Sequence, residues 1–81
     1  MNNREKYNEI FVSIFGVKEE QLDGTFNFNN IESWDSMTHL MLIGELEEIF
    51  DIMLETDDIL HFGGYQNGMT ILKKYGVDFA D

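Results

Sequence analysis

Three residues near the middle of the chain are of the types that build a nucleophilic triad: Asp35, Ser36 and His39. A serine hydroxyl becomes a nucleophile when a histidine takes its proton and an aspartate orients that histidine. Here all three residues lie at the start of one expected helix, where their side chains do not line up as nucleophile, base and orienter. The surrounding sequence also implies no oxyanion pocket, so this pattern does not predict a hydrolase.

Other groups are no better arranged for catalysis or metal binding. His39 and His61 are 22 residues apart with no further ligand at a recognised spacing, and no calcium-type D-x-D-x-D-G loop occurs. Carboxylates are plentiful, but nothing encloses two of them as an acid and a base. The charged stretch from Glu45 to Asp51 therefore indicates a solvated helix face. We expect no metal site and no autonomous enzyme.

Ser36 remains the candidate functional residue because of its position. It follows Asp35 at the point where a long loop becomes the longest expected helix. A serine or aspartate at such a point normally caps the helix by accepting a free backbone N–H. The same helix end favours an anion, so a serine hydroxyl there is also well placed to carry a phosphodiester. The two roles are compatible, and the residues alone leave both open.

Length and charge narrow the class of protein. The chain has 81 residues, 16 acidic and 5 basic side chains and a formal net charge of −11, and we expect a single domain over residues 1–81. A chain this short buries too little surface to enclose a deep active site. Its acidity disfavours nucleic acid and anionic membranes and favours partners with basic surfaces. Its longest apolar run, Leu40–Ile43, is far below the roughly 18 residues of a membrane span, so we expect a cytoplasmic monomer without membrane insertion.

The chain contains no cysteine, which excludes disulfides, thiolate metal sites and thiol nucleophiles. Any thioester chemistry would therefore need a thiol supplied from outside the chain. With 43% hydrophobic and 14% aromatic residues, the sequence is nevertheless too apolar for a disordered acidic tail, so we expect it to fold.

Hydrophobic periodicity predicts a first helix over residues 3–15 and a long loop after it. Asn2 with Glu5 is a weak capping-box pattern, and Gly16 stands where a left-handed residue ends a helix. The apolar residues of this helix form one stripe: Tyr7, Ile10, Phe11, Ile14 and Phe15. The helical pattern is then lost over residues 17–35, a loop with room for short helical turns. We expect these residues to pin the loop to the core: Val17, Leu22, Phe26, Phe28 and Ile31.

Residues 36–50 form the longest expected helix, which has two distinct faces. One face is expected to supply the core: His39, Leu42, Ile43, Leu46, Ile49 and Phe50. The opposite face, flanked by Glu45 and Glu47, carries residues at i, i+4, i+7 and i+11: Met37, Met41, Gly44 and Glu48. Exposed methionines within an acidic surface indicate a contact face.

Two further helices complete an all-α prediction. Thr56 is the expected N-cap of a short helix over about residues 57–61, because acidic residues follow it. After a Gly-Gly break, apolar residues return at helical spacing from Tyr65 until Gly76. We therefore expect a four-helix bundle of three longer helices and one short helix, with a long loop between the first two helices.

The segment around Ser36 resembles the acyl carrier protein family. Its residues Ser33-Trp34-Asp35-Ser36-Met37 are similar to the Asp-Ser-Leu motif of that family, and the run Glu45-Leu46-Glu47-Glu48-Ile49-Phe50-Asp51 is similar to the end of the family's second helix. The resemblance extends over nearly the whole chain, in its length, its acidity, the long first loop, the short third helix and the closing helix. It implies the acyl-carrier-like four-helix bundle.

In this family the serine of the motif is esterified by 4′-phosphopantetheine, whose thiol holds acyl or aminoacyl groups as thioesters. The resemblance implies this role for Ser36, with Asp35 as its motif neighbour, and leaves catalysis to other enzymes. The implied partners are a phosphopantetheinyl transferase, an acyl or aminoacyl ligase or an acyltransferase, and downstream synthase enzymes. Because partners in this family bind along the second helix, the expected recognition residues are Met37, Met41, Glu45 and Glu48.

Departures from the family's pattern indicate a subgroup. Met37 replaces the usual leucine, Ser33 stands near where a glycine is common, and Met41 occupies a position that is often acidic in fatty-acid carriers. These changes make the recognition face less acidic, so we expect a specialised pathway with its own partners. Trp34 resembles stand-alone carriers of polyketide, peptide or cell-surface polysaccharide clusters. The alternatives are an aminoacyl or peptidyl carrier and an unmodified acidic helical adaptor that binds a basic partner.

Overall fold

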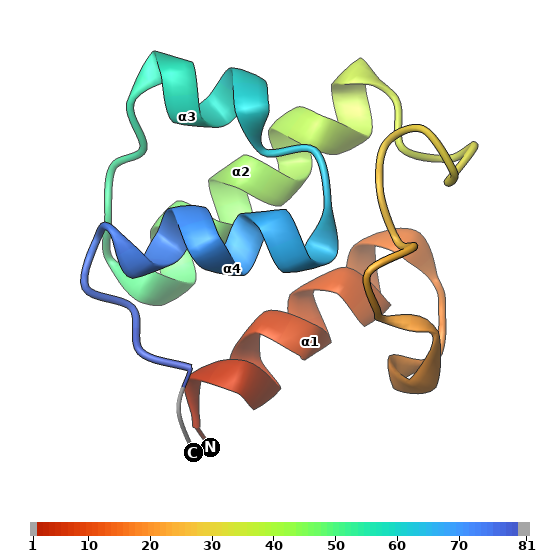
Figure 1. Cartoon of the computed structure of the whole chain (residues 1–81), viewed down its shortest axis with the longest axis horizontal. Coiled ribbons are helices and arrows are strands. Elements are labelled where there is room, and N and C mark those ends of the chain that lie inside the picture. The colour runs from red at the N-terminus through yellow and green to blue at the C-terminus, as the bar shows by residue number, and fades with distance from the viewer. Residues whose placement is uncertain (1, 80–81) are drawn as a thin grey trace.

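In a computed structural model that describes residues 2–79, the chain forms four α-helices and, within that range, no strand (Figure 1). The elements in chain order are α1 (Asn3–Phe15), the 3₁₀ turn η1 (Glu19–Gln21), α2 (Ser36–Phe50), α3 (Thr56–His61) and α4 (Tyr65–Lys73). Three longer helices and one short helix confirm the predicted fold class. The single-domain prediction for residues 1–81 also includes Met1, Ala80 and Asp81, which lie outside the described residues.

α1 begins and ends where the sequence predicts. The Asn2 side chain accepts the backbone N–H of Glu5 at 2.8 Å, and the Asn2 N–H donates to the Glu5 carboxylate, which completes the capping box. Gly16 ends the helix at a φ of 65°, a left-handed conformation that glycine adopts without strain. α1 packs against α2, and the long loop joins the end of α1 to the start of α2 (Figure 1).

Aromatic rings from α1, the long loop and α4 meet in the core. The Phe11 ring lies 5.8 Å from Phe26, 5.9 Å from Trp34 and 5.4 Å from Tyr65, measured between ring centroids, and each pair is arranged edge to face. All four side chains are buried. Phe26 and Trp34 belong to the long loop, so the prediction that Phe26 anchors this loop to the core is confirmed.

Two residues that the sequence assigned to the core lie at the surface. The side chain of Phe28 is 51% exposed, because the Phe28 backbone N–H is bound to the Gly63 carbonyl at 2.8 Å and the ring lies over a surface groove. Ile49 is 44% exposed, so its assignment to the core was also wrong. The buried stripe of α2 is narrower than predicted and consists of Leu42, Ile43 and Leu46.

The last two helices differ from the prediction at their ends. α3 starts one residue earlier than predicted, and Thr56 is its first helical residue rather than its N-cap. Glu55 occupies the N-cap position and makes no side-chain cap hydrogen bond there. α4 ends at Lys73 rather than at Gly76, because residues 74–76 form a turn in which Gly76 has a φ of 86°.

Two buried tyrosines tie α1 to α4. The Tyr7 hydroxyl donates to the Tyr65 carbonyl oxygen at 2.7 Å, and the Tyr65 hydroxyl donates to the Asn8 side chain. Burial raises the pKa of Tyr7 well above its usual value, so its hydroxyl keeps the proton that it donates. A methyl group at Gly68 would overlap both the Phe62 ring and the Tyr7 hydroxyl, so α4 approaches α1 closely only because residue 68 is glycine.

Replacing Gly68 with alanine is therefore expected to destabilise the protein by about 1–3 kcal/mol, because the extra methyl group overpacks the core. Denaturant unfolding measures this change. Gly44→Ala is the matched control, since Gly44 is exposed in α2 and an added methyl group meets nothing within 4 Å. This control should gain roughly 0.5–1 kcal/mol from helix propensity. A Gly68→Ala protein as stable as the wild type would contradict the close packing of α4 on α1.

A cluster of Asp58, Lys74 and Tyr75, here called the Asp58 clasp, holds α3 against the end of α4. The Lys74 ammonium lies 2.6 Å from one oxygen of the Asp58 carboxylate, and the Tyr75 hydroxyl donates to the other oxygen. The Glu55 backbone N–H in turn donates to the Tyr75 hydroxyl at 3.0 Å. The hydrogen bond from Lys74 lowers the pKa of Asp58 below its usual value.

The clasp predicts a pH-dependent contribution to stability. Because the pKa of Asp58 is lower in the folded chain than in the unfolded one, its contribution is present above the unfolded pKa of about 3.9. The contribution is lost as the pH falls through the lower, folded pKa. Asp58→Asn should therefore lower the melting temperature at about pH 7, and this difference from the wild type should shrink toward about pH 3.

Thermal melting followed by circular dichroism across this pH range tests the clasp. Asp57→Asn removes the same charge from the neighbouring exposed position of α3 and serves as the control. If the two variants showed the same difference from the wild type at every pH, Asp58 would have no special role.

Candidate functional site

Ser36 is the first residue of α2, and its side chain is exposed. The helix is capped by Asp35, whose side chain accepts the backbone N–H of Thr38 at 2.8 Å. The Ser36 hydroxyl is therefore not needed as a cap, and within residues 2–79 it has no hydrogen-bond partner. The structure thus divides the two roles that the sequence left open: Asp35 caps the helix and Ser36 presents a free hydroxyl.

Asp35 is a structural carboxylate rather than a base. The hydrogen bond from the Thr38 backbone N–H lowers the pKa of Asp35, so its carboxylate is ionised at neutral pH. A negative charge at this position also interacts favourably with the positive end of the α2 dipole. A carboxylate that is ionised and already hydrogen-bonded is a poor acceptor for the Ser36 proton.

His39 is also committed to other partners. Its Nδ1 accepts the Trp34 indole N–H at 3.0 Å, and its Nε2 lies 2.8 Å from the carbonyl oxygen of Ile59 in α3. Neither ring nitrogen is free to take a proton from Ser36. Asp35 and His39 therefore stabilise the start of α2 through their own hydrogen bonds and do not act on Ser36 as members of a triad.

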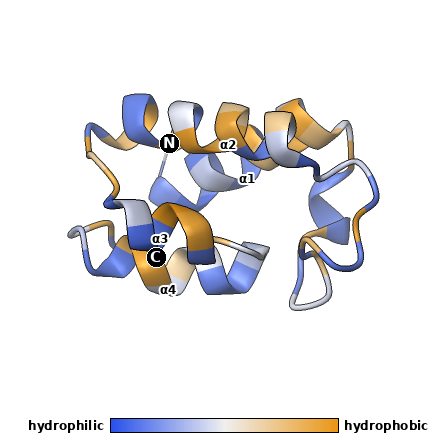
Figure 2. Ribbon diagram, turned by 90° about the horizontal axis from the view of Figure 1, so that it is seen from above, coloured by the Kyte–Doolittle hydropathy of each residue, from blue (hydrophilic) through white to orange (hydrophobic). Residues whose placement is uncertain are grey.

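A surface groove of about 500 Å³ opens beside Ser36, between the start of α2, α3 and part of the long loop. It is lined by Phe28, Asn29, Ser36, His39, Leu40, Ile59, Leu60, Phe62 and Gly63. Three of its apolar side chains are unusually open to solvent, since Phe28 is 51%, Leu40 67% and Leu60 72% exposed. Hydrophobic segments of α2 and α3 are shown in orange in Figure 2. Ser36 therefore lies at the edge of a groove whose walls include exposed apolar side chains.

The four residues predicted to recognise partners all lie exposed along α2, but the structure does not gather them at one place. Met37 is 75% exposed and follows Ser36 directly. Met41, Glu45 and Glu48 line a second groove, of about 520 Å³, between α1 and α2. Ser36, the predicted attachment position, and most of the predicted recognition residues therefore lie in grooves formed with different neighbouring helices.

The sequence interpretation missed the apolar side chains that line the groove beside Ser36. Leu40 carried a signal, because it lies four residues after Ser36 and so shares a helix face with it. Leu60 carried none, since the six residues of α3 are too few to show a periodicity. Phe28 was assigned to the core because its spacing in the loop resembles that of an anchor.

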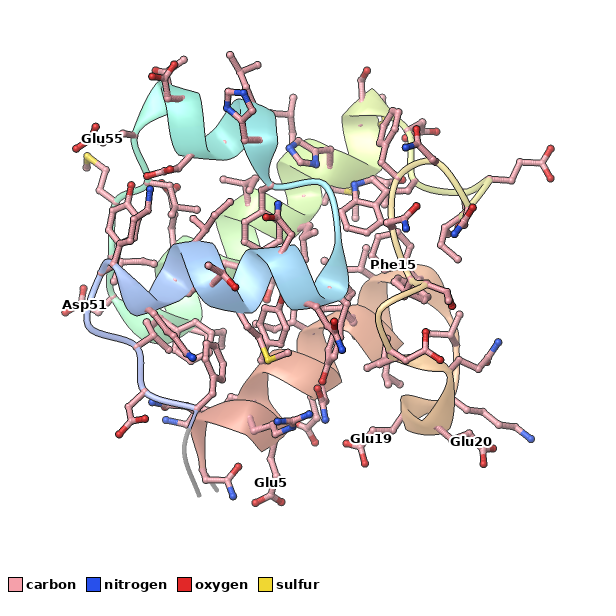
Figure 3. The ribbon with its side chains drawn as sticks, in the orientation of Figure 1. Glu5, Phe15, Glu19, Glu20, Asp51 and Glu55 are labelled. Carbon is pink, nitrogen blue, oxygen red and sulfur yellow. The ribbon has the colours of Figure 1, made fainter. Side chains whose placement is uncertain are left out.

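Acidic side chains surround the fold. Figure 3 shows several of them at its periphery: Glu5, Glu19, Glu20, Asp51 and Glu55. Glu47 differs, because its carboxylate accepts the Leu54 backbone N–H at 2.9 Å and ties the end of α2 to the segment that follows. In the described part of the chain, no three histidine or carboxylate side chains are grouped so as to hold a metal ion. No helix within residues 2–79 is long and apolar enough to cross a membrane.

The chain has a relative among characterised proteins, although no protein-family profile matches it. It is 31% identical over 71 residues to the acyl carrier protein of Chlorobium luteolum (strain DSM 273 / BCRC 81028 / 2530). The match covers 88% of this chain and 91% of the relative. The four helices and the long first loop of this chain agree with this relationship. The chain therefore belongs to the acyl carrier protein family.

Proposed function

We propose that this protein is a carrier whose Ser36 bears a 4′-phosphopantetheine group and presents acyl or aminoacyl groups to partner enzymes. The observation that carries the proposal is the exposed Ser36 hydroxyl at the start of α2, which has no hydrogen-bond partner among residues 2–79 and lies beside an aspartate that already caps the helix. Membership of the acyl carrier protein family supports it.

The residues around Ser36 fit such a group. Its phosphodiester would lie at the N-terminus of α2, where the helix dipole favours an anion. Its flexible arm would meet the apolar walls of the adjacent groove, formed by Phe28, Leu40 and Leu60. When bound, the group supplies the thiol that holds acyl groups as thioesters, and the chain itself has no cysteine. Within this proposal, the groups of the chain near Ser36 bind and orient the arm, and catalysis belongs to partner enzymes.

Modification of Ser36 is directly measurable. Incubation with coenzyme A and a broad-specificity phosphopantetheinyl transferase should increase the intact mass of the wild-type protein by one phosphopantetheine group. Ser36→Ala should show no increase. Ser33→Ala is the matched control, because it removes an exposed hydroxyl from the same loop three residues earlier, and it should be modified like the wild type.

The alternative function predicts the opposite result. If folded wild-type protein gains no mass with several transferases, Ser36 is a plain helix residue, and an acidic adaptor that binds a basic partner becomes the better description. Equal mass gain in Ser36→Ala would place the attachment at another residue.

We further propose that α2 selects the partner enzymes, through Met37, Met41, Glu45 and Glu48. Their exposure supports this role, and the acidic side chains suit docking on basic surfaces that is fast, weak and sensitive to salt. Met37 and Met41 are 75% and 56% exposed, so the partner is expected to present apolar contacts as well. Partners adapted to this mixed face would belong to a specialised pathway rather than to general fatty-acid synthesis.

Met41→Glu tests this selection. A more acidic α2 should improve acceptance by fatty-acid synthase enzymes, lowering the KM for the carrier by roughly two- to fivefold, as one exposed charge pair allows. The measurement is steady-state loading of the modified carrier at low ionic strength. Met53→Glu adds the same charge at a methionine that is 84% exposed outside α2 and should leave the KM unchanged. Identical KM values for both variants and the wild type would contradict a selective role of Met41.

A further inference from the structure

A groove runs between α1 and α2. It consists of two adjoining hollows of about 470 and 520 Å³, which share Ile10, Ser13 and Glu45 as lining residues. The hollow beside the earlier part of α1 lies against the later part of α2, and the other hollow has the reverse pairing, so the two helices run antiparallel along the groove. Its walls are residues 6–14 of α1 and residues 41–49 of α2, each about two helical turns long. We call it the α1–α2 groove.

Apolar side chains line the middle and both ends of this groove. Ile10, which is buried, lies in the middle, where the two hollows meet. Ile14 and Met41 lie at one end, and Ile49 lies at the other. Met41 is 56% and Ile49 is 44% exposed. Exposed apolar side chains that continue a buried one, with charged residues around them, are typical of a protein-binding surface.

The charges of the groove are mostly negative and unpaired. Glu9, Glu45 and Glu48 line it and are exposed. Among residues 2–79, none of their carboxylates has an ion-pair or hydrogen-bond partner. Lys6 also lines the groove, but α2 contains no lysine or arginine. The α1–α2 groove is therefore complementary to a partner that presents basic side chains.

Gly44 lies in the middle of the α2 wall and leaves this part of the groove open. Its backbone is helical rather than left-handed, and a methyl group added there would meet nothing within 4 Å. Glycine inside a helix is destabilising relative to alanine, so nothing within the chain explains its presence here. Ser13, another small residue, lines the same hollow from α1. The two positions leave room for the backbone of a partner to approach closely.

We propose that the α1–α2 groove is a docking site for a basic amphipathic helix of a partner protein. Apolar side chains of that helix contact Ile10 and Met41, and its lysine or arginine side chains pair with the carboxylates of Glu9, Glu45 and Glu48. This inference rests on the proposed selection of partners by α2 and deepens it, because it names the chemistry of the partner and assigns half of the binding surface to α1.

The shape and charge of the groove favour this occupant over others. Two helices packed side by side form a groove into which the side-chain ridges of a third helix fit, and two turns of each wall match two turns of such a helix. A second copy of this chain is disfavoured, because its net charge of −11 would set carboxylates against carboxylates.

Binding of a model helix to the whole, unmodified chain tests the proposal. The probe is a helical peptide of about 14 leucine and lysine residues with its leucines on one face. Its titration into ¹⁵N-labelled protein at about 50 mM salt should shift the amide signals of residues 6–14 and of residues 41–49 together. A peptide of the same composition, with its leucines spread around the helix, should bind at least about fivefold more weakly. Equal affinities would overturn the proposal, because charge alone would then explain the binding.

Ser13→Lys tests the contribution of α1. The new side chain would fill part of the groove and repel the lysines of the peptide, so the Kd should rise at least about fivefold. Thr70→Lys is the matched control, because it also replaces an exposed helical hydroxyl with lysine, but in α4. Its Kd should stay within about twofold of the wild-type value.

Gly44→Lys adds the same side chain from the α2 wall and should weaken binding as Ser13→Lys does. Circular dichroism checks that each variant is folded, and the two groove variants provide independent tests if one of them is not. A Kd for either folded groove variant equal to that of Thr70→Lys would overturn the proposal.

The amide shifts also separate this inference from the proposed function. Shifts in residues 41–49 without shifts in residues 6–14 would leave α2 as the binding surface and overturn the role of α1. Shifts in neither segment would overturn the selection by α2 as well. The attachment at Ser36 is tested separately by mass, because the peptide is titrated into unmodified protein, and Ser36→Ala should bind it with the wild-type Kd.

Discussion

The start of α2 must meet two opposing requirements, and the rest of the site depends on how it does so. The first backbone N–H groups of a helix need acceptors, whereas the proposed attachment at Ser36 needs a serine hydroxyl that is not used as a cap. The Asp35 carboxylate accepts the Thr38 N–H, so the hydroxyl of Ser36 is left to solvent. Trp34 and His39 fix the incoming loop from the other side. The start of α2 is thus hydrogen-bonded through Asp35 and His39, while Ser36, the proposed attachment position, is exposed.

The contacts in the rest of the fold must offset a small core and a large negative charge. A chain of 81 residues with a net charge of −11 has a small core and repels itself. Three sets of contacts act against that repulsion. Edge-to-face aromatic contacts around Phe11 join α1 to the long loop and to α4, and the Tyr7 hydrogen bond joins α1 to α4 again. The Asp58 clasp joins α3 to the turn that follows α4. The groove that Ser36 lines lies at the surface, between the start of α2, α3 and the long loop.

Local signals in the sequence were sufficient for much of the fold. The capping box at Asn2, and the change from loop to helix at Ser36, depend on residues only a few positions apart, so their patterns are readable in one dimension. The two hydrogen bonds of His39 join it to Trp34 and to Ile59, and no local pattern in the sequence relates α2 to α3. Phe28 was mispredicted for the same reason. Its spacing in the loop fitted a core anchor, but its backbone is bonded to Gly63, which is distant in sequence, and its ring lies at the surface. Family resemblance singled out Ser36, but it could not identify the groove.

The central claim is the proposal that Ser36 bears a phosphopantetheine group and that this group lies in the surface groove beside it. Backbone amide chemical shifts of the protein before and after phosphopantetheine transfer test this claim most directly. The account predicts changes confined to the start of α2, the part of the loop around Phe28, and the segment from Ile59 to Gly63. Changes that spread to fully buried core residues such as Leu46 and Leu72 would show that the bundle opens, and would contradict it.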